Sequence, residues 1–359
     1  MILKPSALGV AAVASLAAIP AAAATQFGDY VTLSGFGTAG VVASDNDKVD
    51  FVRDGAPKGA GDNASWAVDS KIGLQANFKA NDWLSATVQV LAEQRHTPGV
   101  KAEFEWAYVN LKPLDNLSIR VGRTAPAVFM VSDSRNVGYA NTMVRMPNDV
   151  YALNSLKRLT GVDATYRLDT PLGGLSISGM AGEGLAVSGG TTNDAKKVRG
   201  INAVFDTAVG SFRLGQVRTD VHVQMSGAIV PYTFSGVGYQ LDVDNFVVMA
   251  EYVKRSISGP YSIFGAKGWY VMGGYRMGQF TPYLAAARTR VDNVSANVLN
   301  GHENTLTAGV RWDVVPGAAV KLQLDQVDPK GGRGISFPMF SPGVGDKTRV
   351  LSLAVDFVF

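Results

Sequence analysis

The sequence predicts an all-β fold: a transmembrane antiparallel β-barrel of about 16 strands, with short periplasmic turns and long extracellular loops. Three observations support this prediction. Apolar and polar residues alternate along many segments, as they do in strands that separate two environments. Short connections between these segments take turns with long ones. The chain begins with an export signal, and no later apolar run reaches the roughly 18 residues that a membrane helix needs.

The first segment, residues 1–24, is predicted to be a cleaved signal peptide. Lys4 supplies the positive start, residues 7–19 form an apolar core, and Pro20 precedes a small-residue exit at 21–24. An N-terminal membrane anchor is the alternative, but the high alanine content and the place of Pro20 argue against it. Residues 25–359 are then expected to form one transmembrane barrel.

Composition excludes several classes of protein. The formal net charge is only +3 and no basic block occurs, so a nucleic-acid partner is not expected. Cysteine is absent, which excludes disulfides and thiolate metal sites. The 40 glycines follow no three-residue period, so they fit a sheet protein with many turns rather than collagen.

The strands are predicted from their alternation. In residues 71–79 one face is apolar, and it comprises Ile72, Leu74, Ala76 and Phe78. Residues 84–93, 305–313 and 320–325 repeat the pattern. Aromatic residues near strand ends are expected at the membrane interfaces, namely Tyr30, Trp66, Phe78, Trp83, Trp269, Phe280, Tyr283, Trp312 and Phe359.

The connections give the strand count. Short turns are predicted at 80–82, 113–116, 170–174, 209–210, 243–245, 278–279 and 315–318. Long loops are predicted at 45–65, 96–101, 124–158, 185–197, 223–231, 258–266, 291–302 and 329–346. In hydrocarbon every backbone polar group must be paired, so the last strand, 351–359, should pair with the first, 30–44. A water-soluble β-sandwich would also alternate, but its loops would not alternate in length.

Several short motifs resemble those of Gram-negative general porins. They are residues 30–37, 69–74, 106–111, 121–123 and 353–359, and the likeness covers essentially the whole mature chain. The resemblance implies a homotrimer in outer-membrane lipid, each barrel with its own water-filled pore for passive diffusion of small polar or ionic solutes. It implies no cofactor and no enzymatic activity. It also implies that Phe359 belongs to the signal that the barrel-assembly machinery reads.

The third long loop, about 124–158, matches the inward-folded constriction loop of that family in position and length. The family's acidic Pro-Glu-Phe-Gly-Gly-like segment is absent, and the charged residues of the loop are two acids and four bases: Asp133, Arg135, Arg145, Asp149, Lys157 and Arg158. We therefore expect a weak anion preference. The loop's aromatic residues, Phe129, Tyr139 and Tyr151, are expected to wedge it against the barrel wall rather than to guide a solute.

A pore selects by its width and by fixed charge at its narrowest ring. Strand parity and the inward loop give the candidate constriction residues Lys71, Glu105, Arg120, Arg123, Asp133, Arg135, Arg145, Arg158, Arg167 and Arg311. The alternative is that these charges are paired and merely solvate the lumen.

Two other functions stay open. A substrate-specific channel or receptor would show saturable block by one solute. A barrel hydrolase would need a histidine on the outer wall, for which His222 is the only loose candidate. The three histidines have no metal-ligand spacing, so no metal is expected.

Overall fold

The computed structural model describes residues 24–359 except 55, 57, 96–98, 189–190, 260–264, 293–301, 331–333 and 339–346. The predicted signal peptide therefore lies, up to residue 23, outside the described residues, and so does His96. No helix of the described part is both long enough and apolar enough to span a bilayer.

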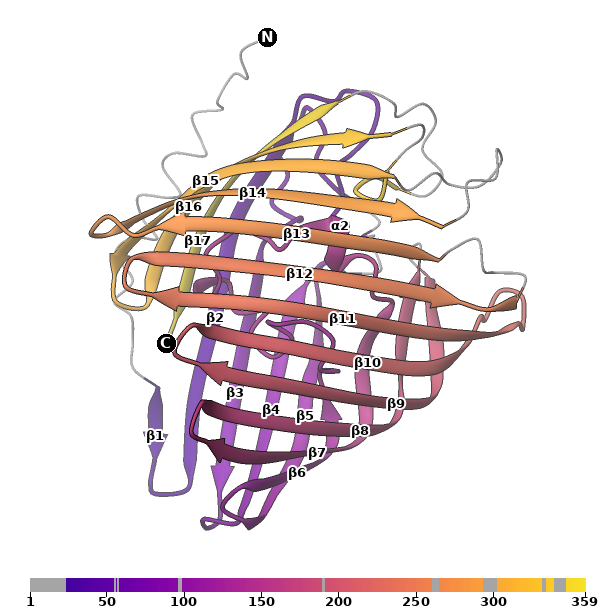
Figure 1. Cartoon of the computed structure of the whole chain (residues 1–359). Helices are drawn as coiled ribbons and strands as arrows, with labels where there is room; N and C mark the ends of the chain where they lie inside the picture. The colour runs from indigo at the N-terminus through magenta and orange to yellow at the C-terminus, as the bar shows by residue number, and fades with distance from the viewer. Residues whose placement is uncertain are drawn as a thin grey trace.

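Sixteen strands form one closed antiparallel barrel, as the sequence predicted (Figure 1). They are β2 (Val31–Ser44), β3 (Lys71–Lys79), β4 (Leu84–Glu93), β5 (Lys101–Leu114), β6 (Leu117–Thr124), β7 (Leu156–Thr170), β8 (Gly173–Ser188), β9 (Thr191–Thr207), β10 (Gly210–His222), β11 (Ile229–Val243), β12 (Phe246–Ile257), β13 (Ala266–Tyr275), β14 (Phe280–Val291), β15 (Glu303–Val315), β16 (Ala318–Pro329) and β17 (Thr348–Val358). Each strand pairs with its neighbour in sequence, and β17 closes the ring against β2 from Val350↔Ser44 to Val358↔Phe36.

A seventeenth, short strand lies outside this ring. β1 (Thr25–Phe27) pairs with Val31 to Leu33 at the start of β2, whereas β17 pairs with β2 from Phe36 onward. The last residue, Phe359, extends the closure by exchanging two backbone hydrogen bonds with Gly35, at 2.7 and 2.9 Å. The backbone of the last strand is thus paired up to its final residue, so the strand leaves no open sheet edge.

Short turns at one rim and longer loops at the other alternate as predicted, with one correction. The predicted long loop at 185–197 does not exist, because β8 and β9 continue as a hairpin until only residues 189–190 separate them. Its polar residues stay in the strands because they pair across the hairpin, as Lys196 does with Glu183 at 2.6 Å. Polar, turn-type residues do not break a strand whose backbone ladder is intact.

The two faces of the barrel follow the alternation. The predicted apolar face of β3 points outward, and Ile72, Leu74 and Phe78 are 48%, 57% and 46% exposed. Most of the predicted interfacial aromatics also lie exposed on the outside. For Tyr283 the predicted position at the membrane interface is wrong. Its side chain is 3% exposed and points into the barrel, where its hydroxyl donates to Gln323 at 2.9 Å.

One connection fills the interior. The loop between β6 and β7, residues 125–155, contains the 3-10 helix η1 (Gly138–Ala140) and the one-turn helix α2 (Asn148–Tyr151). α2 contacts the inner side of β12 to β15, and Figure 1 shows it within the ring of strands. The loop thus lies against the inner side of the barrel wall in this structure, and it positions the candidate site.

Candidate pore constriction

An aromatic cluster fixes both ends of the inward loop to the wall formed by β10 to β13. Phe129 stacks on Tyr151 with ring centroids 4.1 Å apart and meets Phe234 edge-on at 5.4 Å. The Tyr151 hydroxyl donates to buried Glu251 at 2.5 Å, and Glu251 also accepts from the Met130 amide at 2.9 Å. Phe129 and Tyr151 thus wedge the loop, as the sequence suggested.

A second attachment holds the tip of the loop against β15 to β17. Lys321 donates to the carbonyls of Gly138 and Asn141 at 2.8 and 2.5 Å and pairs with Asp356 at 2.8 Å. Arg311 donates to the carbonyls of Tyr139 and Asn141 at 2.7 and 3.0 Å. The backbone comes so close here that a Cβ on Gly138 would lie 2.0 Å from an Asp356 oxygen, so only glycine fits.

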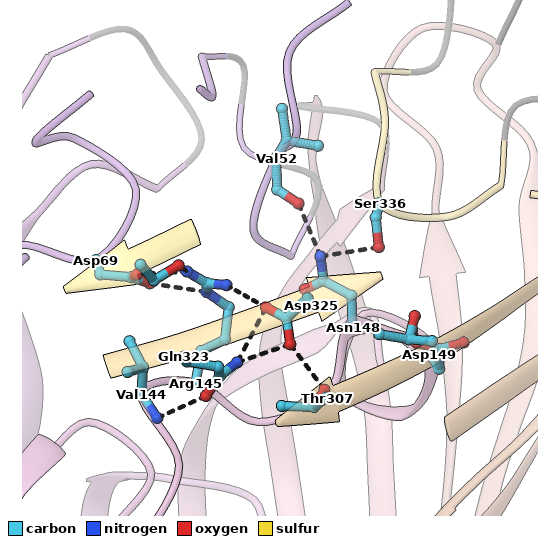
Figure 2. Close-up of polar contacts among 12 residues, drawn as sticks. Val52, Asp69, Val144, Arg145, Asn148, Asp149, Thr307, Gln323, Asp325 and Ser336 are labelled. Atoms are coloured by element: carbon cyan, nitrogen blue, oxygen red, sulfur yellow. Dashed lines mark hydrogen bonds and ion pairs between the residues drawn. The ribbon is translucent and has the colours of Figure 1, made fainter. Parts of the chain in front are cut away.

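Arg145 is the third attachment, and Figure 2 shows it between two acidic side chains. Its guanidinium pairs with Asp69 at 2.8 Å and with Asp325 at 2.9 Å, and it also contacts the Ser352 hydroxyl. Burial disfavours the charged guanidinium, but the two carboxylates outweigh this effect and raise the pKa of Arg145. The predicted constriction residue Arg145 is therefore a buried anchor whose charge is compensated.

The one-turn helix joins the inward loop to the first loop, residues 45–70. Asn148 donates to the Val52 carbonyl at 2.8 Å and accepts from the Asp54 amide at 3.1 Å (Figure 2 shows the first bond). Asp149 accepts from the Thr305 hydroxyl at 2.7 Å. Burial, reinforced by the nearby carboxylate of Glu303, raises the pKa of Asp149 well above its usual value.

These attachments leave a cavity of about 80 Å³ between the loop and the wall of β3 and β4. Its charged lining residues are six bases and two acids: Arg53, Lys71, Arg95, Arg135, Arg145, Lys157, Asp54 and Glu93. We call this cavity the basic cavity. Its lining therefore carries more basic than acidic side chains.

Most bases of the basic cavity are ion-paired. Arg53 pairs with Glu93 at 2.6 Å and Lys157 with Asp54 at 2.7 Å. Arg95 pairs with Glu93 and, at 2.7 Å, with Glu105, which also accepts from Asn136 of the inward loop. Within the described part of the chain, Lys71 and Arg135 are the two lining bases without an ion pair.

The other predicted constriction residues lie elsewhere. Arg120 pairs with Asp163 across β6 and β7 at 2.7 Å, and Asp133 lies near them, its pKa raised by burial against the attraction of Arg120. Arg158 pairs with Glu103 at 3.2 Å. Arg167 is exposed on the lumen side near the short-turn rim.

Arg123, which was predicted to line the pore, lies on the outer face of the barrel. It lies two residues after Val121, which is 49% exposed on the lipid side, so it shares that outward face. Its guanidinium donates to the Phe104 carbonyl at 3.3 Å instead of entering the pore. Its position beside the inward loop in sequence suggested a pore residue, but strand parity decides the side on which it lies.

Three residues of the basic cavity, Arg53, Arg95 and Lys157, were not among the constriction residues predicted from the sequence. Arg53 and Arg95 belong to the first and second long loops, where no alternation indicates direction. Lys157 occupies an irregularity of register between Leu156 and Arg158, which turns it inward. No signal in the sequence would have placed the two loop arginines there.

Comparison with known proteins identifies the family. A family model described as Gram-negative porin matches residues 9–332. The chain belongs to the Gram-negative porin family. No curated protein sequence matches this porin significantly.

Solved porin structures share the fold of this porin at low sequence identity. An anion-selective porin from Comamonas acidovorans is 15% identical with a TM-score of 0.62, over 92% of this chain and 99% of that one. OmpF of Salmonella typhi in complex with daunomycin is 12% identical with a TM-score of 0.62, over 92% and 97%. The outer-membrane channel DcaP of Acinetobacter baumannii is 13% identical with a TM-score of 0.58, over 94% and 100%.

The family and the closed barrel together establish what this porin does. It is an outer-membrane channel for passive diffusion of small hydrophilic solutes. Among the described residues no group of three potential metal ligands gathers. His222, the candidate for a barrel hydrolase, ends β10 and pairs through its backbone with Asp194 and Ile229.

Proposed function

We propose that this porin prefers anions, and that the basic cavity sets the preference. The observation that supports this proposal is the lining of six bases and two acids beside the inward loop. Fixed charge acts most strongly where a pore is narrow, because ions there pass within the roughly 8 Å over which salt screens a charge at physiological ionic strength.

The preference should be weak, because ion pairs compensate most of the bases. A base that pairs with a carboxylate adds little net field beyond that pair. Lys71 and Arg135, which lack ion pairs among the described residues, supply the uncompensated charge. They lie on different elements, β3 and the inward loop, and both line the basic cavity.

Reversal potential in a planar bilayer under a salt gradient tests this proposal. The wild type should give a modest anionic potential, and K71Q/R135Q should move it most of the way to zero. R167Q is the matched control, because Arg167 faces the lumen but lies far along β7 from the inward loop. A cationic wild type, or a double variant identical to it, would refute the assignment. Saturable block by one solute would instead favour the substrate-specific channel.

We also propose that the porin assembles as a homotrimer. Its support is that a trimer form of OmpT from Vibrio cholerae is 12% identical with a TM-score of 0.58, over 92% of this chain and 100% of that one. The outward positions of β2 to β5 near the long-loop rim are also uncharged: Val41, Ala43, Ile72, Ala92 and Ala102. Surfaces buried between subunits are depleted in charge. Sedimentation of the purified porin in detergent and conductance steps in threes would test the trimer.

Export and assembly complete the proposal. We propose that residues 1–24 are removed during export, which mass spectrometry of the purified porin would show as a mature chain starting at Thr25. Phe359, which ends the barrel seam beside Gly35, is proposed as the residue that the barrel-assembly machinery recognises.

A further inference from the structure

We propose that the lumen wall formed by β3 to β6 binds the pyranose rings of sugars as they pass through the pore. The central residues of this site are Trp106 and Tyr108 on β5, which we call the aromatic pair. Figure 1 shows β3 to β6 side by side along one wall of the barrel. The inference goes beyond the proposed ion preference and does not depend on it.

The aromatic pair lies between the inward loop and the short-turn rim. Glu105, which directly precedes Trp106, accepts a hydrogen bond from Asn136 of the inward loop at 3.1 Å. From there β5 runs on to its short turn at 115–116. A solute that has passed the inward loop therefore meets the aromatic pair next.

The aromatic pair faces the lumen of the barrel. Trp106 lies opposite Gln89 in the strand register, and Gln89 is buried inside the barrel. Tyr108 lies opposite Thr87, which is also buried inside. Val88, between these two partners, is 40% exposed on the lipid side. The two rings are half-buried, with centroids 6.5 Å apart. Because the interior of a porin is polar and filled with water, two neighbouring rings there form a distinct apolar platform.

The barrel wall beside Tyr108 carries no side chains. Gly122, Gly161 and Gly182 follow Tyr108 in register across β6, β7 and β8. A Cβ on these glycines would lie 2.3, 2.1 and 2.3 Å from a carbonyl oxygen of a neighbouring strand, so the backbone there admits only glycine. The wall is therefore flat on the β6 side of Tyr108, as a ring-shaped solute requires for close approach.

The inward loop stacks its own aromatic residues elsewhere. Phe129 meets Phe234 of β11, and Tyr151 lies 6.2 Å from Tyr270 of β13, on the far wall of the barrel. These two rings hold the loop, whereas the aromatic pair has no ring of the loop as a described stacking partner. The aromatic pair is therefore available to a solute.

Hydrogen-bonding groups lie on both sides of the aromatic pair. On the β6 side, the guanidinium carbon of Arg120 lies 5.4 Å from the centroid of the Tyr108 ring, and its Nε pairs with Asp163 at 2.7 Å. Among the described residues, the two Nη nitrogens of Arg120 have no hydrogen-bond partner. On the β4 side, Thr87 donates to Oδ1 of Asn77 at 3.0 Å, and Nδ2 of Asn77 has no partner in the described part of the chain. These donors can bind the hydroxyl groups of a solute.

A cavity of about 570 Å³ adjoins the aromatic pair on the short-turn side. Asn77 and Thr87 line it, and so does Ser85, which lies opposite Asn110, two residues after Tyr108. Sites for small molecules have volumes of roughly 300–1,000 Å³. The cavity therefore has room for a sugar that lies against the Tyr108 ring.

This combination of groups fits the chemistry of a pyranose. A pyranose ring has a face of C–H groups and an edge of hydroxyl groups. The face of an aromatic ring carries partial negative charge and attracts such C–H groups, while the surrounding donors bind the hydroxyl groups. An acyclic polyol of similar size has the hydroxyl groups but no flat C–H face. The aromatic pair should therefore favour pyranoses over acyclic polyols.

Block of the ion current by sugars in planar bilayers tests the inference. Methyl glucopyranoside and methyl galactopyranoside should lower the conductance of the wild type to a plateau, because a bound ring obstructs the lumen. Sorbitol, which is acyclic, should lower the conductance only in proportion to the viscosity of the solution. W106A/Y108A should weaken the apparent affinity for both pyranosides roughly 4- to 100-fold, since each aromatic contact contributes roughly a factor of two to ten.

Further variants separate the rings from their volume. W106L/Y108L keeps apolar side chains but removes both rings, and it should lose affinity as the alanine variant does. Y108F keeps the ring and should retain the affinity. F104A is the matched control, because Phe104 lies on the same strand but is 53% exposed on the lipid side. The reversal potential of every variant should equal that of the wild type, which reports an intact inward loop.

Equal effects of the pyranosides and sorbitol on the wild type would overturn the inference, and so would wild-type affinity in W106A/Y108A. Saturation with only one of the two pyranosides would also overturn it, and would indicate a substrate-specific channel. A wild type that binds both pyranosides without an anionic reversal potential would support this inference and refute only the proposed ion preference.

Discussion

Replacing Arg145 by glutamine should loosen the inward loop and change the pore. The Arg145 guanidinium lies between Asp69, on the approach to β3, and Asp325, on β16, with side-chain exposures of 5%, 3% and 6%. R145Q leaves both buried carboxylates without their ion-pair partner. Removing one partner of a buried ion pair destabilises by about 3–5 kcal/mol, because the remaining charge stays desolvated.

The loss acts mainly on the loop, because the barrel strands keep their own hydrogen-bond ladders. At about 1.4 kcal/mol per factor of ten, the equilibrium for detaching this segment should shift toward the detached form by roughly a hundred-fold to a few thousand-fold. Detachment withdraws the loop from the lumen. We therefore expect R145Q to show a larger single-channel conductance and stronger current fluctuations than the wild type in planar bilayers.

A second variant separates charge burial from lost contact. R145M/D69N/D325N removes all three charges together, and such replacements are often nearly neutral for stability. This variant should return the conductance and the fluctuations toward the wild-type values. Wild-type conductance and noise in R145Q would refute the reasoning, because Arg145 would then not hold the loop.

Three further predictions concern the loop and the barrel seam. G138A should increase current fluctuations in planar bilayers, because its Cβ would lie 2.0 Å from an Asp356 oxygen; G174A, with no atom within 4 Å, should behave as wild type. Burial raises the pKa of Asp149, so the folded protein holds this proton more tightly than the unfolded chain does. The resulting stability is complete below the unfolded pKa of about 3.8 and is lost as pH rises through the folded one, so D149N should flatten the fall in unfolding temperature that begins as pH rises above about 3.8. F359A should lower the amount of porin in the outer membrane of cells, while the same variant refolded in detergent should conduct like wild type if Phe359 acts in recognition.

The fold could be predicted from the sequence because lipid imposes a local rule. An outward side chain must be apolar and the next one is free to be polar, so residues 71–79 reveal both the strand and its orientation. Where strands extend beyond the membrane, lipid no longer requires apolar outward side chains, so alternation does not reveal the strand. The hairpin of β8 and β9 continues there with polar residues, and a loop was predicted instead.

The charged site was less predictable, because its partners are distant in sequence. Arg145 and Lys321 carry the charges expected of pore residues, yet Arg145 meets a partner 180 positions away and Lys321 binds a carbonyl 183 positions away. Alternation indicates on which face of the barrel a charged side chain lies, but it does not indicate whether an oppositely charged side chain forms an ion pair with it. Arg123 shows the converse case, since alternation alone would have placed it correctly on the outside.

The loop's basic excess and the pore's basic excess therefore have different origins. Of the four bases counted in the loop sequence, Arg145, Lys157 and Arg158 are compensated by acids of other elements, and Arg135 alone contributes an uncompensated charge to the basic cavity among the described residues. The other base without an ion pair, Lys71, comes from the barrel wall, where it lies opposite Glu93 in the strand register. Under the proposed function, anchored bases fix the width of the passage, whereas bases without an ion pair fix its field. Neutralising Arg145 should thus change conductance far more than reversal potential, and neutralising Lys71 with Arg135 should do the reverse. If R145Q and K71Q/R135Q changed conductance and reversal potential in the same proportion, this separation of roles would be refuted.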